Sequence, residues 1–468
     1  MIKNYCNFKR IDGKYLLTND IGRFIFLTEL EFKSFVESTI LSSDLFNKLE
    51  TNFFVSNKNF EHFVQDTAIE LRRNKQYLFT GTQLHIFVLT NHCNLNCVYC
   101  QVSATNEKSI KGYMNFETAK KAVDLALQSP ANNLTFEFQG GEPLLNFETL
   151  KFIVEYSRLV NIKNKNIQYN LVSNLTIINA DIINFLIEND ISIATSIDGD
   201  EEVNDYNRPN GNVGTFKVVR RNLEVIRETY RAKGINKEVN AILTTTRKSL
   251  DKYVEIIDEY IRLDLNKIFI RPLTPLGNCV DNWALIGYSP EEFIEFYINC
   301  IEYIIAKNNE GVVVSEFHME ILLKKILTNN PINYMELRSP CGGAIGQLAY
   351  NYDGSIYTCD EARMIAERGD FSFKIGHVDL SIFNDLIDNE ISKSVCLSSC
   401  LELLPGCSEC VFSPYCGACP VYNYIEQNSI FAKMPESYKC KIYKGMLEYI
   451  FKKISNPKDF NIIKKWIE

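Results

Sequence analysis

Apolar and polar positions change period regularly through the middle of the chain. Short apolar runs, typical of buried strands, alternate with segments in which apolar residues recur at helical spacing. The predicted strands are 84–90, 134–139, 167–172, 192–197, 239–244 and 268–272. The predicted helices are 116–127, 147–159, 180–188, 216–230, 253–263 and 290–306. This alternation predicts an α/β fold, a partial (β/α)6 barrel of the TIM type spanning about residues 84–310.

The first 80 residues follow another pattern. Two short strands with a turn at Asp12–Gly13 and a third strand at 22–28 precede a helix that starts at residue 29 and helices at about 45–49 and 60–73. Thr28 is expected to cap the first helix, with Glu31 completing a capping box. This piece resembles the small winged-helix peptide-recognition elements of peptide-modifying enzymes. A structural cap on the barrel is the alternative.

The end of the chain has little regular periodicity. Residues 311–335 are predicted to form a helical bridge, and 446–468 a closing helix. Between them, residues 336–445 are rich in turns and cysteines, so bound metal clusters are expected to stabilise them.

Composition and charge limit the classes of function that the chain can have. The 468 residues are 46% hydrophobic, carry a net charge of −8 and contain no basic run, so nucleic acid is not an expected partner. No apolar run approaches a membrane span and residues 1–6 do not begin a signal peptide, so we expect a cytoplasmic protein that does not enter a membrane. Disulfides are disfavoured in the cytosol, so the 15 cysteines point to metal or redox use.

Three of these cysteines follow the first barrel strand in the spacing Cys-x3-Cys-x2-Cys. Cys93, Cys97 and Cys100 would hold a cuboidal iron–sulfur cluster and leave one iron open for a small molecule. An incomplete zinc site and three unrelated buried thiols are the alternatives. The next strand ends in Gly140-Gly141-Glu142-Pro143, where two glycines permit close backbone approach and a carboxylate can take an ammonium group.

Together these motifs resemble the radical S-adenosylmethionine (SAM) superfamily. The resemblance implies a [4Fe–4S] cluster that cleaves SAM reductively to a 5′-deoxyadenosyl radical, which abstracts a hydrogen from the substrate. It places the SAM amino group at Gly140, Gly141 and Glu142. The remaining SAM contacts that it implies are Tyr99 and Leu273 near the adenine, and Ser173, Asn174 and Arg208 at the ribose or carboxylate.

A second group of cysteines resembles the SPASM extension of radical SAM enzymes, which carries auxiliary [4Fe–4S] clusters. The resemblance assigns Cys407, Cys410, Cys416 and Cys440 to one cluster, and Cys341, Cys359 and Cys419 to another. Two full clusters need eight thiols and only seven are present in this group, so the second cluster lacks one ligand. An open iron, a non-cysteine ligand or an absent cluster would each account for the missing thiol. Paired Cys-x2-Cys motifs alone would suggest zinc equally well. Asp360, next to Cys359, matches a general base of SPASM enzymes that oxidise peptides, but it can also be a turn aspartate.

Further stretches, including Arg271-Pro272-Leu273 and Leu404-Pro405-Gly406-Cys407, resemble the B-type radical SAM maturase of His-Xaa-Ser peptide systems. The resemblance implies oxidative modification, with crosslinking expected, of a ribosomally made precursor peptide. It also implies an electron donor such as flavodoxin or ferredoxin, and a second radical SAM maturase encoded nearby. The alternatives are a maturase that oxidises a cysteine or serine of a partner enzyme, as in sulfatase maturation, and a non-catalytic iron–sulfur or zinc scaffold.

Overall fold

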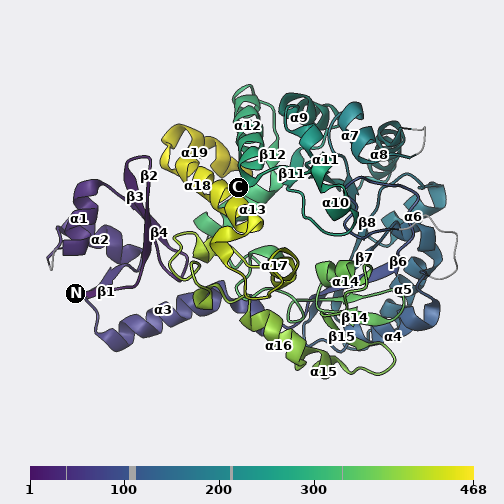
Figure 1. The fold of residues 1–468 in the computed structure, drawn as a ribbon, viewed down its shortest axis with the longest axis horizontal. Coiled ribbons are helices and arrows are strands. Elements are labelled where there is room, and N and C mark those ends of the chain that lie inside the picture. Colours follow the sequence, from purple (N-terminus) through teal and green to yellow (C-terminus); the bar gives the residue numbers. More distant parts are fainter. Residues whose placement is uncertain (38–39, 105–111, 211–213, 329) are drawn as a thin grey trace. The chain divides into compact units, whose positions relative to one another are not determined.

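The computed structural model describes residues 1–37, 40–104, 112–210, 214–328 and 330–468, which pack into two units (Figure 1). The larger unit contains Thr80–Phe317 and Gly342–Cys396. The smaller unit contains Met1–Phe79, His318–Cys341 and Leu397–Glu468.

A ten-stranded sheet forms the centre of the larger unit, in the order β12-β11-β10-β9-β8-β7-β6-β13-β14-β15. Strands β6 to β12 run parallel to their neighbours, β13 pairs parallel with β6, and β14 and β15 add antiparallel. The predicted α/β fold with a mostly parallel sheet is confirmed. The six predicted strands are β6 (Leu84–Thr90), β7 (Asn133–Gly140), β8 (Asn166–Val172), β9 (Ser192–Ser196), β10 (Asn240–Thr244) and β11 (Lys267–Arg271).

The predicted helices are present as well, and Figure 1 shows them around the parallel strands. Short polar side chains start several of them: Asn115 and Asn179 accept backbone N–H groups, and Ser289 forms a capping box with Glu292. The helices are α4 (Phe116–Ala126), α5 (Phe147–Val160), α6 (Ala180–Glu188), α8 (Thr215–Ala232), α9 (Tyr253–Arg262) and α12 (Pro290–Asn309).

Four strands of this sheet were not predicted from the sequence. They are β12 (Ser315–Glu316), β13 (Gln347–Tyr350), β14 (Ser355–Tyr357) and β15 (Lys374–His377), each of two to four residues. Such short runs carry too few residues to show a period. The pairing of β13 with β6 also joins distant parts of the chain, which local pattern does not report.

The smaller unit begins with the three predicted strands, β2 (Asn7–Ile11), β3 (Lys14–Thr18) and β4 (Phe24–Leu27), in one antiparallel sheet. The predicted helices follow as α1 (Glu29–Glu37), α2 (Ser43–Thr51) and α3 (Phe60–Asn74). The predicted capping box is confirmed: the backbone N–H of Thr28 donates to Glu31 at 2.7 Å, and the backbone N–H of Glu31 donates to Thr28 Oγ1 at 3.3 Å.

The two ends of the chain fold together in this smaller unit. Lys9 pairs with Glu448 of α18 (Tyr438–Ser455) at 2.5 Å, and Thr18 Oγ1 donates to the Val411 carbonyl at 2.7 Å. The rings of Phe24 and Phe451 meet edge to face with centroids 5.4 Å apart. Among the described residues, no helix has the length and apolar character needed to cross a bilayer.

Candidate active site

The cysteine loop begins where β6 ends, at the carboxyl edge of the parallel sheet. The Cys93 thiol lies within electrostatic reach of Cys97 and Cys100, so the three predicted ligands are close to one another. Main-chain bonds hold the loop: the Val98 N–H donates to the Asn207 carbonyl at 2.9 Å. Burial raises the pKa of Cys93 to about 12 and that of Cys97 to about 11, so both are neutral thiols until a metal displaces their protons.

Gly140 and Gly141 bring the end of β7 against this loop. The Gly141 N–H donates to the Thr90 carbonyl at 2.8 Å, and the Glu142 N–H donates to the His92 carbonyl at 2.8 Å. A Cβ atom on Gly140 would lie 2.2 Å from the Thr90 oxygen, and one on Gly141 would lie 2.2 Å from the His92 oxygen. The two glycines therefore permit a close approach between β7 and the main chain at Thr90 and His92.

Glu142 is fully buried beside the cysteine loop and is held by three donors. Its Oε1 accepts the Leu144 N–H at 3.0 Å and the Ser173 hydroxyl at 2.8 Å, and its Oε2 accepts the Asn174 N–H at 2.8 Å. Burial raises the pKa of Glu142, while these donors and Arg208 act in the opposite direction. The carboxylate is thus oriented by the ends of two neighbouring strands, and it retains acceptor capacity for a cation.

Ser173 and Asn174 were predicted as direct SAM contacts, and in the structure they orient other groups of the site. Asn174 Nδ2 donates to Asn94 Oδ1 at 2.9 Å and lies 3.8 Å from the Cys93 sulfur. Ser173 Oγ also accepts the Leu175 N–H at 3.0 Å. The two residues therefore connect Glu142 to the cysteine loop.

Tyr99 and Arg208 form a buried cluster with Asp198, which was not among the predicted site residues. The Tyr99 hydroxyl donates to Asp198 Oδ2 at 2.7 Å, and Arg208 Nη1 donates to the Tyr99 oxygen at 2.6 Å. The positive charge of Arg208 opposes the rise in the pKa of Cys97. The signal for Asp198 was its position at the end of the fourth predicted strand, where a buried core does not favour a carboxylate.

Leu273 and Asp360 belong to the same unit but differ in character. Leu273 is a buried apolar residue that follows β11. The N–H of Leu273 donates to the Tyr288 hydroxyl at 2.7 Å. Asp360 opens α14 (Asp360–Ala366), and its Oδ1 accepts Arg363 Nε at 2.7 Å. Arg363, a fully buried partner that the sequence did not point to, fixes this carboxylate. Oδ2 accepts no hydrogen bond from the described part of the chain.

The smaller unit brings four predicted ligands around one cavity of about 20 Å³, here called the four-thiol cavity: Cys407, Cys410, Cys416 and Cys440. Its other walls are mostly apolar, with Phe412, Met434 and Leu447 among them. Burial raises the pKa of Cys407 and Cys416 to about 12, and the neighbouring thiols raise it further. Four soft sulfur donors with apolar surroundings fit an iron–sulfur cluster.

The remaining predicted ligands are divided between the units. Cys341 and Cys419 belong to the smaller unit and Cys359 to the larger, so their common cluster stays a prediction. Among the described residues, no three His, Cys, Asp or Glu side chains are arranged around a point suited to a single metal ion. A cuboidal cluster has a different requirement, because each thiolate binds its own iron.

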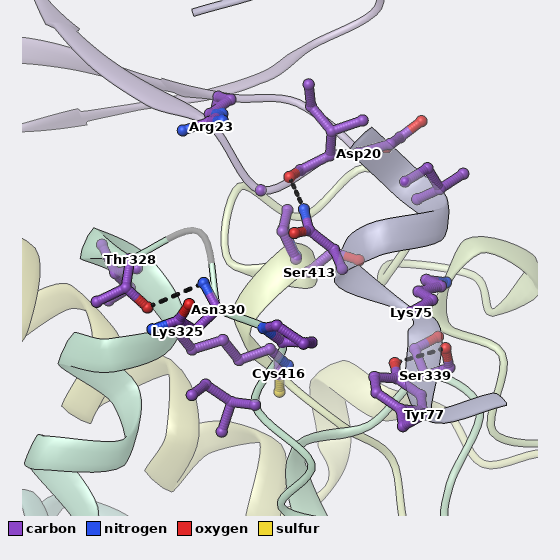
Figure 2. A pocket seen from close by; sticks show the side chains of 18 of the residues that line it. Asp20, Arg23, Lys75, Tyr77, Lys325, Thr328, Asn330, Ser339, Ser413 and Cys416 are labelled. Atoms are coloured by element: carbon purple, nitrogen blue, oxygen red, sulfur yellow. Dashed lines mark hydrogen bonds between the residues drawn. The ribbon is translucent and has the colours of Figure 1, made fainter. Parts of the chain in front are cut away.

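A polar cavity of about 90 Å³ adjoins the four-thiol cavity, and Cys416 lines both (Figure 2). Its charged side chains include Arg23 and Lys325, and Lys75 is paired there with Glu402. Lys325, on α13 (Phe317–Leu327), donates to the Leu337 carbonyl. Burial lowers the pKa of Lys325 to about 8, whereas the charge of Cys416 acts to raise it. Sequence reasoning did not single out this lysine, since nothing in its local pattern places it beside a thiol.

Comparison with known proteins finds a family match within the larger unit. Residues 87–237 match the family model of the Radical SAM superfamily. The chain is 27% identical over 336 residues to the cysteine-type anaerobic sulfatase-maturating enzyme of Clostridium novyi, covering 70% of this chain and 84% of that enzyme.

Solved structures show the same fold. The native enzyme anSMEcpe with bound AdoMet aligns with a TM-score of 0.68 and 22% identity, over 82% of this chain and 99% of that one. Streptococcus suis SuiB bound to S-adenosylmethionine aligns with a TM-score of 0.54 and 15% identity, over 91% and 97%. anSMEcpe has also been solved with a Cp18Cys peptide, and SuiB with the precursor peptide SuiA.

Proposed function

Taking as premise that this chain is an enzyme of the radical SAM family, we propose that it oxidatively modifies a ribosomally made precursor peptide. One observation carries the proposal. At the ends of β6, β7 and β8, three thiols, a fixed buried carboxylate and the residues that orient it meet within one unit.

Each group of this site has an assigned task. Cys93, Cys97 and Cys100 hold a [4Fe–4S] cluster with one open iron, and Glu142 receives the SAM ammonium group. When bound, the cluster and SAM supply the 5′-deoxyadenosyl radical that abstracts a substrate hydrogen. Arg208 places positive charge beside Cys97 and pairs with the SAM carboxylate.

Of the other predicted SAM contacts, two keep that role within this proposal and four support the site. Tyr99 and Leu273 line the adenine site, and Gly140 and Gly141 keep the main chain close to the cysteine loop. Ser173 and Asn174 act through Glu142, because their donors already bind its carboxylate.

A peptide is supported as the substrate by the neighbours' own ligands. Structures of anSMEcpe and SuiB, which share this fold, contain peptides. Asp360 would accept the proton released after hydrogen abstraction, through the oxygen that Arg363 leaves open. The four-thiol cavity would hold an auxiliary cluster, and Cys341, Cys359 and Cys419 would hold a second; such clusters would supply one-electron acceptors near the substrate. Flavodoxin or ferredoxin is the expected electron donor to the enzyme.

The finer assignment is to His-Xaa-Ser peptide maturation, with a crosslink as the product and a second radical SAM maturase as a partner in the cytoplasm. The similarity to the Clostridium novyi enzyme favours a second candidate, oxidation of a cysteine or serine on a partner sulfatase. The two differ in what gains the modification: a small peptide or a folded enzyme.

The test is anaerobic incubation of the reconstituted chain with SAM, a reductant and a neighbouring precursor peptide. We expect 5′-deoxyadenosine and a peptide lighter by two hydrogens for each crosslink, as measured by mass spectrometry. Cys97→Ala should abolish both products, whereas Cys6→Ala, a thiol assigned to no cluster, should retain them. An unchanged peptide together with an oxidised sulfatase would replace the first candidate by the second. Persistent 5′-deoxyadenosine in Cys97→Ala would refute the cluster assignment.

A further inference from the structure

Two lysines lie beside the four-thiol cavity. Lys444 of α18 lines that cavity directly. Lys325 of α13 lines the adjoining polar cavity, whose wall it shares with Cys416 (Figure 2). The thiol site is therefore flanked by positive charge contributed by two different helices.

Both ammonium groups share a cavity wall with the thiols. Lys325 and Cys416 line the polar cavity together, and Lys444 lines the four-thiol cavity with Cys407 and Cys440. An attraction that stabilises a thiolate also stabilises any other negative charge placed among these sulfurs, and apolar walls weaken its screening.

The two lysines differ in how firmly they are held. Lys325 is half-buried in the wall of the polar cavity and is fixed by its bond to the Leu337 carbonyl. Lys444 has no hydrogen bond or ion pair with any residue that the structure describes. We therefore expect Lys325 to exert the larger effect, since a charge held in one place by a hydrogen bond acts more strongly than one on a mobile side chain.

We propose that Lys325 and Lys444 raise the reduction potential of an iron–sulfur cluster held in the four-thiol cavity. This inference rests on the proposed function, which supplies that cluster. On reduction the cluster takes one electron from a low-potential one-electron donor; no bond forms or breaks and no proton is bound. The added negative charge is stabilised by the nearby ammonium groups, so the reduced state becomes easier to reach. An auxiliary cluster tuned in this way accepts the substrate electron more readily.

The experiment is a redox titration followed by electron paramagnetic resonance. It uses the full chain in which Cys93, Cys97 and Cys100 are alanine, so that the SAM-binding cluster is removed. The signal that disappears on the further substitution Cys410→Ala belongs to the four-thiol cavity. Its midpoint potential is then measured in Lys325→Met, Lys444→Met and Lys325→Arg. Lys324→Met is the matched control, because Lys324 is the adjacent residue on α13, lines neither cavity and lies 3.8 Å from Glu320.

We expect Lys325→Met to lower the ratio of reduced to oxidised cluster at least tenfold at a fixed potential. For a one-electron couple this corresponds to a fall of about 59 mV in the midpoint potential. Lys444→Met should shift the ratio in the same direction by less, while Lys325→Arg and Lys324→Met stay within twofold of the parent. A ratio within twofold in Lys325→Met with full iron content would overturn the inference, as would iron loss in Lys325→Met, which marks a structural role. A parent chain with no such signal would instead refute the auxiliary cluster of the proposed function.

Discussion

Replacing Glu142 by glutamine is the sharpest test of how the site binds SAM. The carboxylate oxygens accept three hydrogen bonds, at 3.0, 2.8 and 2.8 Å, in a fully buried position. An amide keeps one acceptor oxygen and turns its NH2 group toward at least one of these donors, so at least one bond is lost. The SAM ammonium also loses its charged partner.

The size of the effect follows from these bonds. A hydrogen bond to a charged group contributes about 1.5–3 kcal/mol, so loss of the ammonium contact should weaken SAM binding about 10- to 150-fold. The unmatched donor should lower the free energy of unfolding by about 1–3 kcal/mol. Isothermal titration calorimetry under anaerobic conditions measures the first effect, and urea unfolding measures the second.

Two variants separate charge from orientation. Ser173→Ala removes one donor but keeps the carboxylate charge, so SAM affinity should fall less than tenfold, or by about 1.4 kcal/mol at most. Glu137→Gln changes another carboxylate of the same strand, which accepts Gln139 Nε2 at 2.6 Å, and should leave SAM affinity unchanged. If Glu142→Gln bound SAM within threefold of the native chain, Glu142 would not be the ammonium receptor.

Three further predictions concern other parts of the chain. Cys410→Ala should lower iron content by about four per chain and abolish peptide product while 5′-deoxyadenosine still forms; unchanged product would make that cluster dispensable. Asp360→Asn, which keeps the bond from Arg363, should also retain SAM cleavage and lose product in the same mass-spectrometric assay; product at the native rate would exclude Asp360 as the base. Burial lowers the pKa of His85 from 6.5 to about 3. Between these two pH values the imidazole is protonated in the unfolded chain and neutral in the folded one, so the free energy of unfolding falls as the pH drops through that window. At pH 5 the loss should be about 2 kcal/mol, and His85→Gln should remove it in urea unfolding at pH 7.5 and 5; an unaltered pH dependence would contradict this.

Sequence pattern predicted the elements that are long enough to show a period. The six main barrel strands, their helices and the capping box at Thr28 all lie where the pattern indicated. It did not predict β13, a four-residue strand that joins the sheet beside β6 and places residues 342–396 in the larger unit. Pairing between distant segments leaves no local period, so the sequence offered no means to find it.

The candidate site also contains residues that the sequence could predict and residues that it could not. Spacing alone predicted that Cys93, Cys97 and Cys100 lie together, because residues close in sequence on one loop lie close in space. It could not report that Ser173 orients Glu142, that Asp198 anchors Tyr99 or that Lys325 lies beside Cys416. These partners come from separate strands and helices, and only the fold brings them together.

The pairing of Gly140 and Gly141 with the cysteine loop bears on how such an enzyme diversifies. The strand end and the loop are joined by main-chain hydrogen bonds, in which the N–H groups of Gly141 and Glu142 donate to the carbonyls of Thr90 and His92. Every residue carries such a carbonyl, whatever its side chain. These two bonds therefore hold the cysteine loop to the strand end independently of side chains, and the bond from Asn174 to Asn94 adds to them. Side chains elsewhere around the site can therefore change without breaking these main-chain bonds, whereas a single methyl group on either glycine would displace the loop.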